Sequence, residues 1–137
     1  VPVLSFIFRA MNAIPIAPEK EDAAMKKRAF ENVAEALAAG EIVGIFPEGR
    51  LTETGEMNPF RPGVVQIVAA TPVPVIPMAL SGLWGSFFSR SANGQAMRRF
   101  RGIFSRISLT VGKPIPATEV AIGDLQRTVL ELRGEQR

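Results

Sequence analysis

The sequence predicts an α/β domain in which a layered mixed sheet is flanked by helices. Apolar runs short enough for buried strands alternate along the 137 residues with segments whose apolar residues recur at helical spacing. The chain has no internal repeat and no low-complexity tract, and its length suits one domain with its own core. We therefore expect a single domain over residues 1–137.

The first elements are expected to be two helices and two strands. An apolar helix is predicted over residues 2–10 and a strand over 13–16. Residues 19–39 have the pattern of an amphipathic helix, because apolar side chains recur at four-residue spacing: Met25, Ala29, Val33 and Leu37. Gly40 stands where a helix often ends in the left-handed conformation. The apolar run 42–46 then predicts a buried strand.

A loop, a short helix and a strand are expected next. Residues 51–60 are mostly polar and predict a loop. Pro62 suits the first turn of a helix, where a missing N–H costs nothing, and apolar residues follow it. A buried strand is expected over residues 73–80, where two prolines favour an edge position or a bulge.

The last third of the chain predicts a loop, a strand and a closing helix. Residues 81–94 are rich in glycine and serine and predict a loop. Residues 107–111 alternate as a strand does. The closing helix is expected to begin at Thr118 or at Gly123 and Asp124, and its apolar side is Leu125, Val129 and Leu132.

Cysteine and histidine are both absent from the sequence. Without cysteine there is no disulfide, no thiolate metal site and no cysteine nucleophile. Without histidine there is no imidazole base, and most zinc sites are excluded, so we expect no metal and no cofactor. No apolar run reaches the roughly 20 residues of a spanning helix. We therefore do not expect this chain to cross a membrane by itself.

Charge is distributed unevenly along the chain, although its net value is only +3. No acidic residue lies between Glu56 and Glu119, and that stretch carries seven basic residues. Such a basic stretch predicts an anionic partner: lipid headgroups, a phosphorylated acyl carrier or nucleic acid.

The run Phe-Pro-Glu-Gly-Arg at residues 46–50 follows the predicted strand 42–46. In α/β sheets the chemistry gathers beyond the carboxyl ends of the strands. The run would place a carboxylate, a backbone N–H and a guanidinium at such an edge, a combination suited to a phosphorylated substrate with a hydroxyl group. Taken alone, the pentapeptide could also form an ordinary tight turn.

Three ordered blocks resemble the glycerophosphate and lysophospholipid acyltransferases. Residues 46–50 resemble the third conserved block of that family, and Pro-Phe-Arg-Pro-Gly at 59–63 follows at the family's spacing. Residues 73–80 resemble its fourth block, a Val-Pro strand with a second proline. Residues 83–90 are similar to bacterial members, including the acyltransferase part of 2-acylglycerophosphoethanolamine acyltransferases.

The resemblance implies a glycerol-3-phosphate acyltransferase-like fold that is incomplete at its N-terminus. It implies transfer of a fatty acyl group from acyl-CoA or acyl carrier protein to the hydroxyl of a lysophospholipid or of glycerol phosphate. In the family the general base is the histidine of an Asn-His-four residues-Asp block, which we expect upstream of Val1. The chain also begins without methionine or a recognisable signal peptide, and we expect it to be part of a longer protein.

The resemblance also implies roles for individual residues. Glu48 and Gly49 are expected to bind and orient the acceptor, with Arg50 on its phosphate and Arg61 as a further candidate for the same anion. Two departures bear on the acceptor. Arg50 follows the glycine directly, where the family usually has Thr and then Arg, and residues 14–18 lack the Asp and Arg of the second block. A lysophospholipid with a larger headgroup therefore fits as well as glycerol phosphate or better.

The prolines of the fourth block, Pro74 and Pro77, are expected to shape the wall of the substrate groove. A segment of interleaved aromatic and basic residues follows them: Phe87, Phe88, Arg90, Arg98, Arg99 and Arg101. This pattern predicts contact with a membrane surface. Aromatic core residues with solvated arginines, or a single-stranded nucleic acid site, are the alternatives.

We accordingly expect an enzyme of phospholipid synthesis on the cytoplasmic face of a membrane, peripheral or as part of a larger membrane protein. The competing hypothesis is a non-catalytic lipid- or phosphate-binding module. A nucleic-acid-binding domain is the third possibility, and it would show oligonucleotide affinity that falls steeply with salt.

Overall fold

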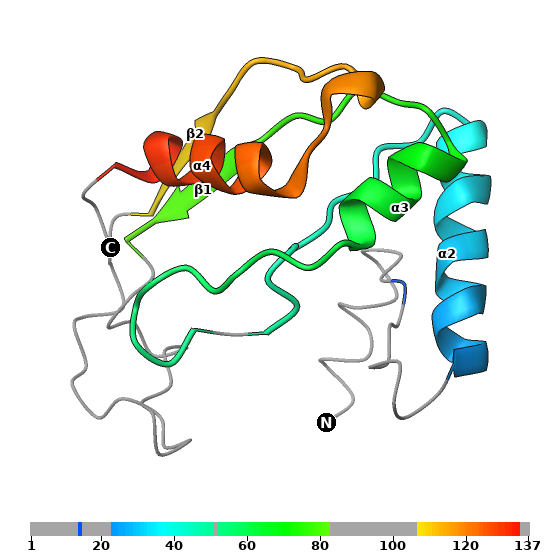
Figure 1. Ribbon diagram of the computed structural model, residues 1–137, viewed down its shortest axis with the longest axis horizontal. Coiled ribbons are helices and arrows are strands. Elements are labelled where there is room, and N and C mark those ends of the chain that lie inside the picture. The colour runs from blue at the N-terminus through cyan, green and yellow to red at the C-terminus, as the bar shows by residue number, and fades with distance from the viewer. Residues whose placement is uncertain (1–13, 15–22, 51, 83–106, 135–137) are drawn as a thin grey trace. The chain divides into compact units, whose positions relative to one another are not determined.

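A computed structural model describes residues 14, 23–50, 52–82 and 107–134 (Figure 1). The chain divides into two compact units, Val1–Gly44 and Ile45–Arg137, each of which is taken by itself. The helix predicted over residues 2–10 lies outside the described residues. So does the strand predicted over 13–16, apart from Ile14, which is not in a strand.

Helix α2, Ala23–Ala38, confirms the amphipathic helix of the first unit. Ala29 and Val33 of the predicted apolar stripe are buried. The helix ends in a Schellman motif, in which Gly40 has φ +80°, its N–H donates to the carbonyl of Leu37 (3.1 Å), and the N–H of Glu41 donates to the carbonyl of Ala36 (3.0 Å). A glycine is required here because other residues adopt this conformation only at a cost.

The buried strand predicted over residues 42–46 is wrong. Residues 41–46 are not in a strand, and their large apolar side chains are exposed: Ile42 is 100% exposed and Phe46 is 81% exposed. A strand needs a neighbour to take up its backbone N–H and C=O groups. The described residues contain one sheet, of two strands that both lie elsewhere, and it supplies no such neighbour.

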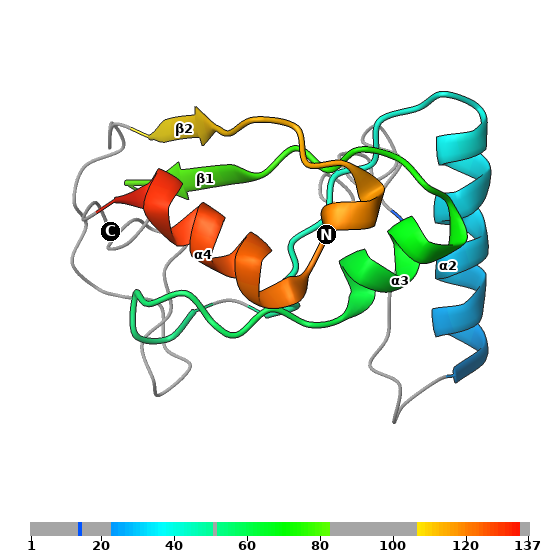
Figure 2. The ribbon, with the colours of Figure 1, turned by 45° about the horizontal axis from the view of Figure 1, so that its top comes forward.

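The sheet of the second unit pairs β1, Met78–Ser81, with β2, Ser108–Val111, in antiparallel fashion (Figure 2). Strand β2 confirms the alternating segment. Strand β1 is shorter than the predicted 73–80, because Pro74 and Pro77 have no N–H to donate to a ladder. Pairing resumes at a single bridge between Val75 and Ile115, and β2 is the one strand that pairs with β1 among the described residues.

The described residues of this unit also form two α-helices and a short 3₁₀ helix. Helix α3, Gly63–Ala70, begins one residue after Pro62, and its Val64 and Val68 are buried. The 3₁₀ helix η1, Ala117–Glu119, precedes α4, Ile122–Arg133. The closing helix therefore starts beside Gly123, the second of its two predicted starting points, while Thr118 belongs to η1.

Helix α4 lies along the sheet (Figure 1). Side chains of β1 alternate in exposure, since Ala79 and Ser81 are buried while Met78 and Leu80 are about half exposed. This alternation corrects the prediction of a fully buried strand, because helix α4 packs on one face of the sheet only.

The face of the sheet opposite α4 is apolar. Its large side chains are 43–57% exposed, and they alternate along the two paired segments: Ile76, Met78, Leu80, Ile107, Leu109 and Val111.

Candidate functional site

A tight turn holds the Pro-Glu-Gly sequence at the start of the second unit. The N–H of Gly49 donates to the carbonyl of Phe46 (3.1 Å), which closes a four-residue β-turn, and Gly49 has φ +64°. The N–H of Arg61 donates to the carbonyl of Pro47 (2.8 Å). This bond fixes the turn to the residues just before α3, although the two segments are more than ten residues apart in the chain.

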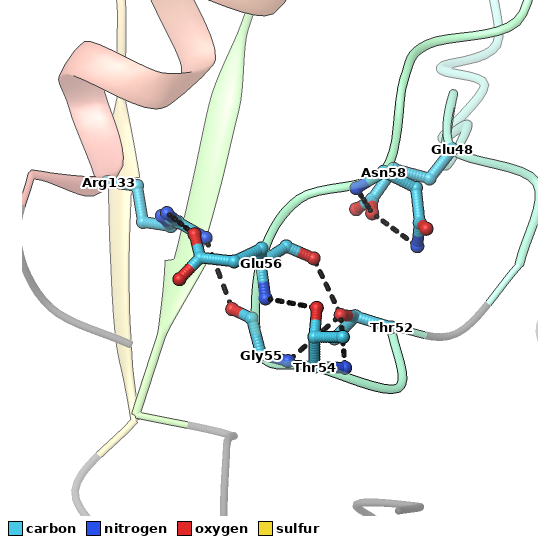
Figure 3. Close-up of polar contacts among 7 residues, drawn as sticks. All are labelled: Glu48, Thr52, Thr54, Gly55, Glu56, Asn58 and Arg133. Atoms are coloured by element: carbon cyan, nitrogen blue, oxygen red, sulfur yellow. Dashed lines mark hydrogen bonds and ion pairs between the residues drawn. The ribbon is translucent and has the colours of Figure 1, made fainter. Parts of the chain in front are cut away.

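Asn58 connects the carboxylate and the guanidinium of this turn. The backbone N–H of Asn58 donates to Oε2 of Glu48 (2.6 Å), and its side-chain Nδ2 donates to the same oxygen (3.1 Å) (Figure 3). On its other side, Oδ1 of Asn58 accepts a hydrogen bond from Nε of Arg50 (3.0 Å). Glu48 is half-buried and Arg50 is exposed.

Arg61 lies against the backbone of the same turn. A β-carbon built on Gly49 would be 3.0 Å from both Cδ and Nε of Arg61 and 3.3 Å from its Cζ. The side chain of Arg61 therefore runs across the glycine, and this close approach is possible because Gly49 has no side chain. The structure thus brings Arg61 against the turn that carries Glu48, Gly49 and Arg50.

The loop that delivers Asn58 is ordered by its own threonines. Oγ1 of Thr52 accepts from the backbone N–H of Thr54 (3.4 Å) and Gly55 (3.1 Å) and donates to the carbonyl of Glu56 (2.6 Å). The N–H of Glu56 donates to Oγ1 of Thr54 (3.3 Å) (Figure 3). The predicted polar loop is confirmed over residues 52–60, and these bonds give it a defined conformation.

Helix α4 holds the same loop at two points on either side of Asn58. Oε1 of Gln126 accepts from the N–H of Phe60 (3.2 Å). Arg133 donates from Nη1 to the carbonyl of Gly55 (3.4 Å), and its Nη2 lies 3.2 Å from Oε2 of Glu56. Gln126 and Arg133 are seven residues apart, about two helical turns, and so lie on one side of α4.

Three contributors to this arrangement were missed in the sequence: Asn58, Gln126 and Arg133. Asn58 belongs to a loop whose composition predicts only polarity. The seven-residue spacing of the other two residues is visible in the sequence and shows that they share a helix face. Nothing in that spacing indicates which loop they contact.

The two prolines of the fourth block lie on the segment that leads into β1. Pro77 is buried, and its carbonyl accepts from the N–H of Gly112 (2.9 Å). A β-carbon on Gly112 would lie 2.9 Å from Cγ of Pro77 and 3.0 Å from Cδ1 of Leu132, which shows how tightly proline, strand and helix pack. Pro74 is exposed beside the bridge at Val75.

The predicted membrane-contact residues lie outside the described residues: Phe87, Phe88, Arg90, Arg98, Arg99 and Arg101. In the part of the chain that is described, no helix combines the length and apolar character needed to span a membrane. No acidic cluster of the size that binds a metal ion occurs there either.

The turn combines one carboxylate with two guanidinium groups at the protein surface. Guanidinium groups bind phosphate with two parallel hydrogen bonds, and a carboxylate accepts a hydrogen bond from a hydroxyl. The two terminal nitrogens of Arg50 have no hydrogen-bond partner among the described residues. The site is therefore chemically suited to a ligand that carries both a phosphate and a hydroxyl group, and it contains no imidazole.

Comparison with known proteins gives concordant matches. The model of the acyltransferase family matches residues 1–81. A chloroplastic 1-acyl-sn-glycerol-3-phosphate acyltransferase of Brassica napus is 30% identical over 82 residues, which are 60% of this chain and 23% of that protein. A second such enzyme, from Cocos nucifera, is 45% identical over 38 residues, 28% of this chain and 12% of that protein.

A third relative, a chloroplastic 1-acyl-sn-glycerol-3-phosphate acyltransferase of Arabidopsis thaliana, is 27% identical over 82 residues, 60% of this chain and 22% of that protein. The matched part of the chain thus spans less than a quarter of each of these three relatives. No solved structure gives a significant match.

Proposed function

This chain belongs to the acyltransferase family, and we propose that it forms the acceptor-binding part of an enzyme that transfers a fatty acyl group to a phosphorylated acceptor. The acyl donor would be acyl-CoA or acyl carrier protein, and the acceptor the hydroxyl of a lysophospholipid or of glycerol phosphate. The observation that carries the proposal is the turn at Glu48. The Glu48 carboxylate and the Arg50 guanidinium both bind Asn58 there, and the side chain of Arg61 runs across Gly49.

The reaction requires a base that the chain does not contain. The acceptor oxygen attacks the thioester carbonyl and forms an ester bond, the carbon–sulfur bond breaks, and the proton of the hydroxyl passes through the base to the leaving thiolate. A group poised near neutral pH suits that role, and the ordinary pKa of a carboxylate near 4.3 does not. We propose that the base is a histidine upstream of Val1, and that the present chain is inactive by itself.

Each residue of the turn would then have a separate task. Arg50 would offer its two terminal nitrogens to the acceptor phosphate, because its Nε is already engaged by Asn58. Arg61 would add a second positive charge from across Gly49. Glu48 would accept a hydrogen bond from an acceptor hydroxyl through Oε1, since both of its hydrogen bonds from Asn58 reach Oε2.

The two guanidinium groups of the turn support a phosphate in the acceptor, and they do not specify the rest of its headgroup. The three relatives are named as 1-acyl-sn-glycerol-3-phosphate acyltransferases, which supports an acylated glycerol phosphate. A lysophospholipid with a larger headgroup is equally compatible with a phosphate site that is exposed at the surface. The acylated acceptors and the product of either reaction are lipids, so we propose that the protein works at a membrane surface. We also propose that this chain has the layered α/β fold that its family membership implies.

The absence of histidine favours a second candidate, a lipid- or phosphate-binding module that retains the phosphate site without a base. The two candidates are separated by measuring thiol release from acyl-CoA or acyl carrier protein with lysophospholipid acceptors. The assay is run on this chain and on an N-terminally extended form that contains the histidine block.

Activity in the extended form alone would support the enzyme, with its base upstream. Activity in the short chain would contradict the upstream base and require a mechanism without histidine. Lipid binding with no thiol release from either form would favour the binding module. In an active extended form, Glu48→Gln should lower the rate far more than it lowers stability, and a near-normal rate would remove Glu48 from the site.

A further inference from the structure

We propose that Asn58 is a positioning residue of the phosphate site. Its side-chain amide keeps the Glu48 carboxylate and the Arg50 guanidinium apart, and it orients the terminal nitrogens of Arg50 toward the acceptor phosphate. This inference rests on the proposed function, because it concerns the same acceptor.

The amide of Asn58 can be oriented in only one way between its two neighbours. Nδ2 faces Oε2 of Glu48 at 3.1 Å, and Oδ1 faces Nε of Arg50 at 3.0 Å. An ionised carboxylate accepts hydrogen bonds and does not donate them, while a guanidinium donates and does not accept. A flipped amide would therefore place oxygen against oxygen and nitrogen against nitrogen, so the donor and acceptor ends are determined by the chemistry of the two charged groups.

The amide separates two opposite charges that lie only two residues apart in the chain. Glu48 and Arg50 form no ion pair in the described structure; each contacts Asn58 instead. A direct two-point pair would occupy at least one terminal nitrogen of Arg50 and so remove a donor that a phosphate could use. Asn58 binds Nε, which fixes the guanidinium at that atom. The two terminal nitrogens have no partner among the described residues and are available there for a two-point contact with a phosphate.

The backbone of Asn58 is held by contacts that do not involve its side chain. Its backbone N–H donates to Glu48 at 2.6 Å, and the loop on either side is held by Gln126 and Arg133 of α4. Replacing the side chain with alanine leaves these contacts in place. The Asn58→Ala variant should therefore fold normally while it loses the amide between the two charges.

The test measures binding of a soluble acceptor, 1-hexanoyl lysophosphatidic acid, to the full chain by titration calorimetry. Asn58→Ala should weaken binding about 10- to 150-fold, which is the range of one hydrogen bond to a charged group. Asn58→Asp should weaken it at least as much, because a second carboxylate would repel Glu48 and neutralise Arg50. Asn32→Ala, an exposed asparagine on α2, is the matched control and should bind like the wild type.

A double-variant cycle separates positioning from a merely structural role. In an Arg50→Ala background the further change Asn58→Ala should alter affinity less than about twofold, because the group it positions is gone. Monohexanoylglycerol, which has no phosphate, should bind Asn58→Ala and the wild type alike. Equal loss of affinity from Asn58→Ala with and without Arg50 would overturn the inference, as would loss of affinity for the phosphate-free ligand.

The outcomes also distinguish this inference from the proposed function. A wild-type chain that binds lysophosphatidic acid, with Asn58→Ala binding equally well, would overturn only the positioning role. A wild-type chain with no affinity for lysophosphatidic acid would overturn the acceptor site itself, and the role of Asn58 with it.

Discussion

Replacing Gly49 with alanine adds a single β-carbon to the candidate site. Gly49 has φ +64°, a conformation that residues with a β-carbon adopt only at a cost. The added β-carbon would also lie 3.0 Å from Cδ and Nε of Arg61, closer than such atoms normally approach. The substitution therefore acts on the backbone of the turn and on one of its two guanidinium groups.

The two effects have different sizes. The left-handed conformation costs a residue with a β-carbon about 1–2 kcal/mol. The contact with Arg61 involves an exposed, flexible side chain that can rotate away, and an unfavourable rotamer adds about 0.5–1.5 kcal/mol. We therefore expect Gly49→Ala to lower the free energy of unfolding by about 2 kcal/mol. With a urea dependence of about 2 kcal/mol per molar, the unfolding midpoint should fall by about 1 M.

Urea unfolding of four proteins separates the two effects: the wild type, Gly49→Ala, Arg61→Ala and the double variant. In the Arg61→Ala background the alanine at position 49 should cost only the backbone part. Gly40→Ala is a second control, because Gly40 has φ +80° with nothing within 4 Å of an added β-carbon. A Gly49→Ala variant as stable as the wild type would refute the positive φ. An undiminished cost in the double variant would refute the contact with Arg61.

Three further outcomes are expected. Gly112→Ala should lower the free energy of unfolding by about 1–3 kcal/mol, because its β-carbon would clash with Pro77 and Leu132. Gly123→Ala is the control: its β-carbon would enter open space on α4, and the change should be neutral or stabilising by up to about 1 kcal/mol. Equal effects of the two variants would contradict the packing at Gly112. Gln126→Ala should cost about 0.5–1.5 kcal/mol and speed hydrogen exchange at the amide of Phe60, and unaltered exchange there would refute this anchor. Ile42→Thr should change the free energy of unfolding, measured by thermal denaturation, by less than about 0.5 kcal/mol, since Ile42 is fully exposed. A large decrease would show that Ile42 is buried, as the predicted strand required.

The helices could be predicted from the sequence because their signals are local. The four-residue spacing of apolar side chains and Gly40 located α2 and its end, and Pro62 located the start of α3 to within one residue. The strands were predicted less well because a strand depends on a partner. Residues 42–46 have the composition of a buried strand, yet no described segment pairs with them, so their apolar side chains lie exposed.

The candidate site could be predicted in part. Glu48, Gly49 and Arg50 are adjacent in the sequence, and Arg61 was included through a family resemblance that the family match supports. The structure adds Asn58 between the two charged groups and α4 behind the loop that carries it. Asn58 is ten residues from Glu48, and Gln126 is 66 residues from Phe60.

The sequence by itself determined which chemical groups this protein possesses: a carboxylate and two guanidinium groups near a tight turn, no thiol and no imidazole. It also determined the family, because the family is identified by sequence motifs and by their order along the chain. Only the tertiary structure decided that the amide of Asn58 stands between Glu48 and Arg50, so that these opposite charges do not pair with each other. The physical reason is that hydrogen bonds act over about 3 Å in space. Residues far apart in the chain come within that distance only after the loop has closed onto α4 and the turn.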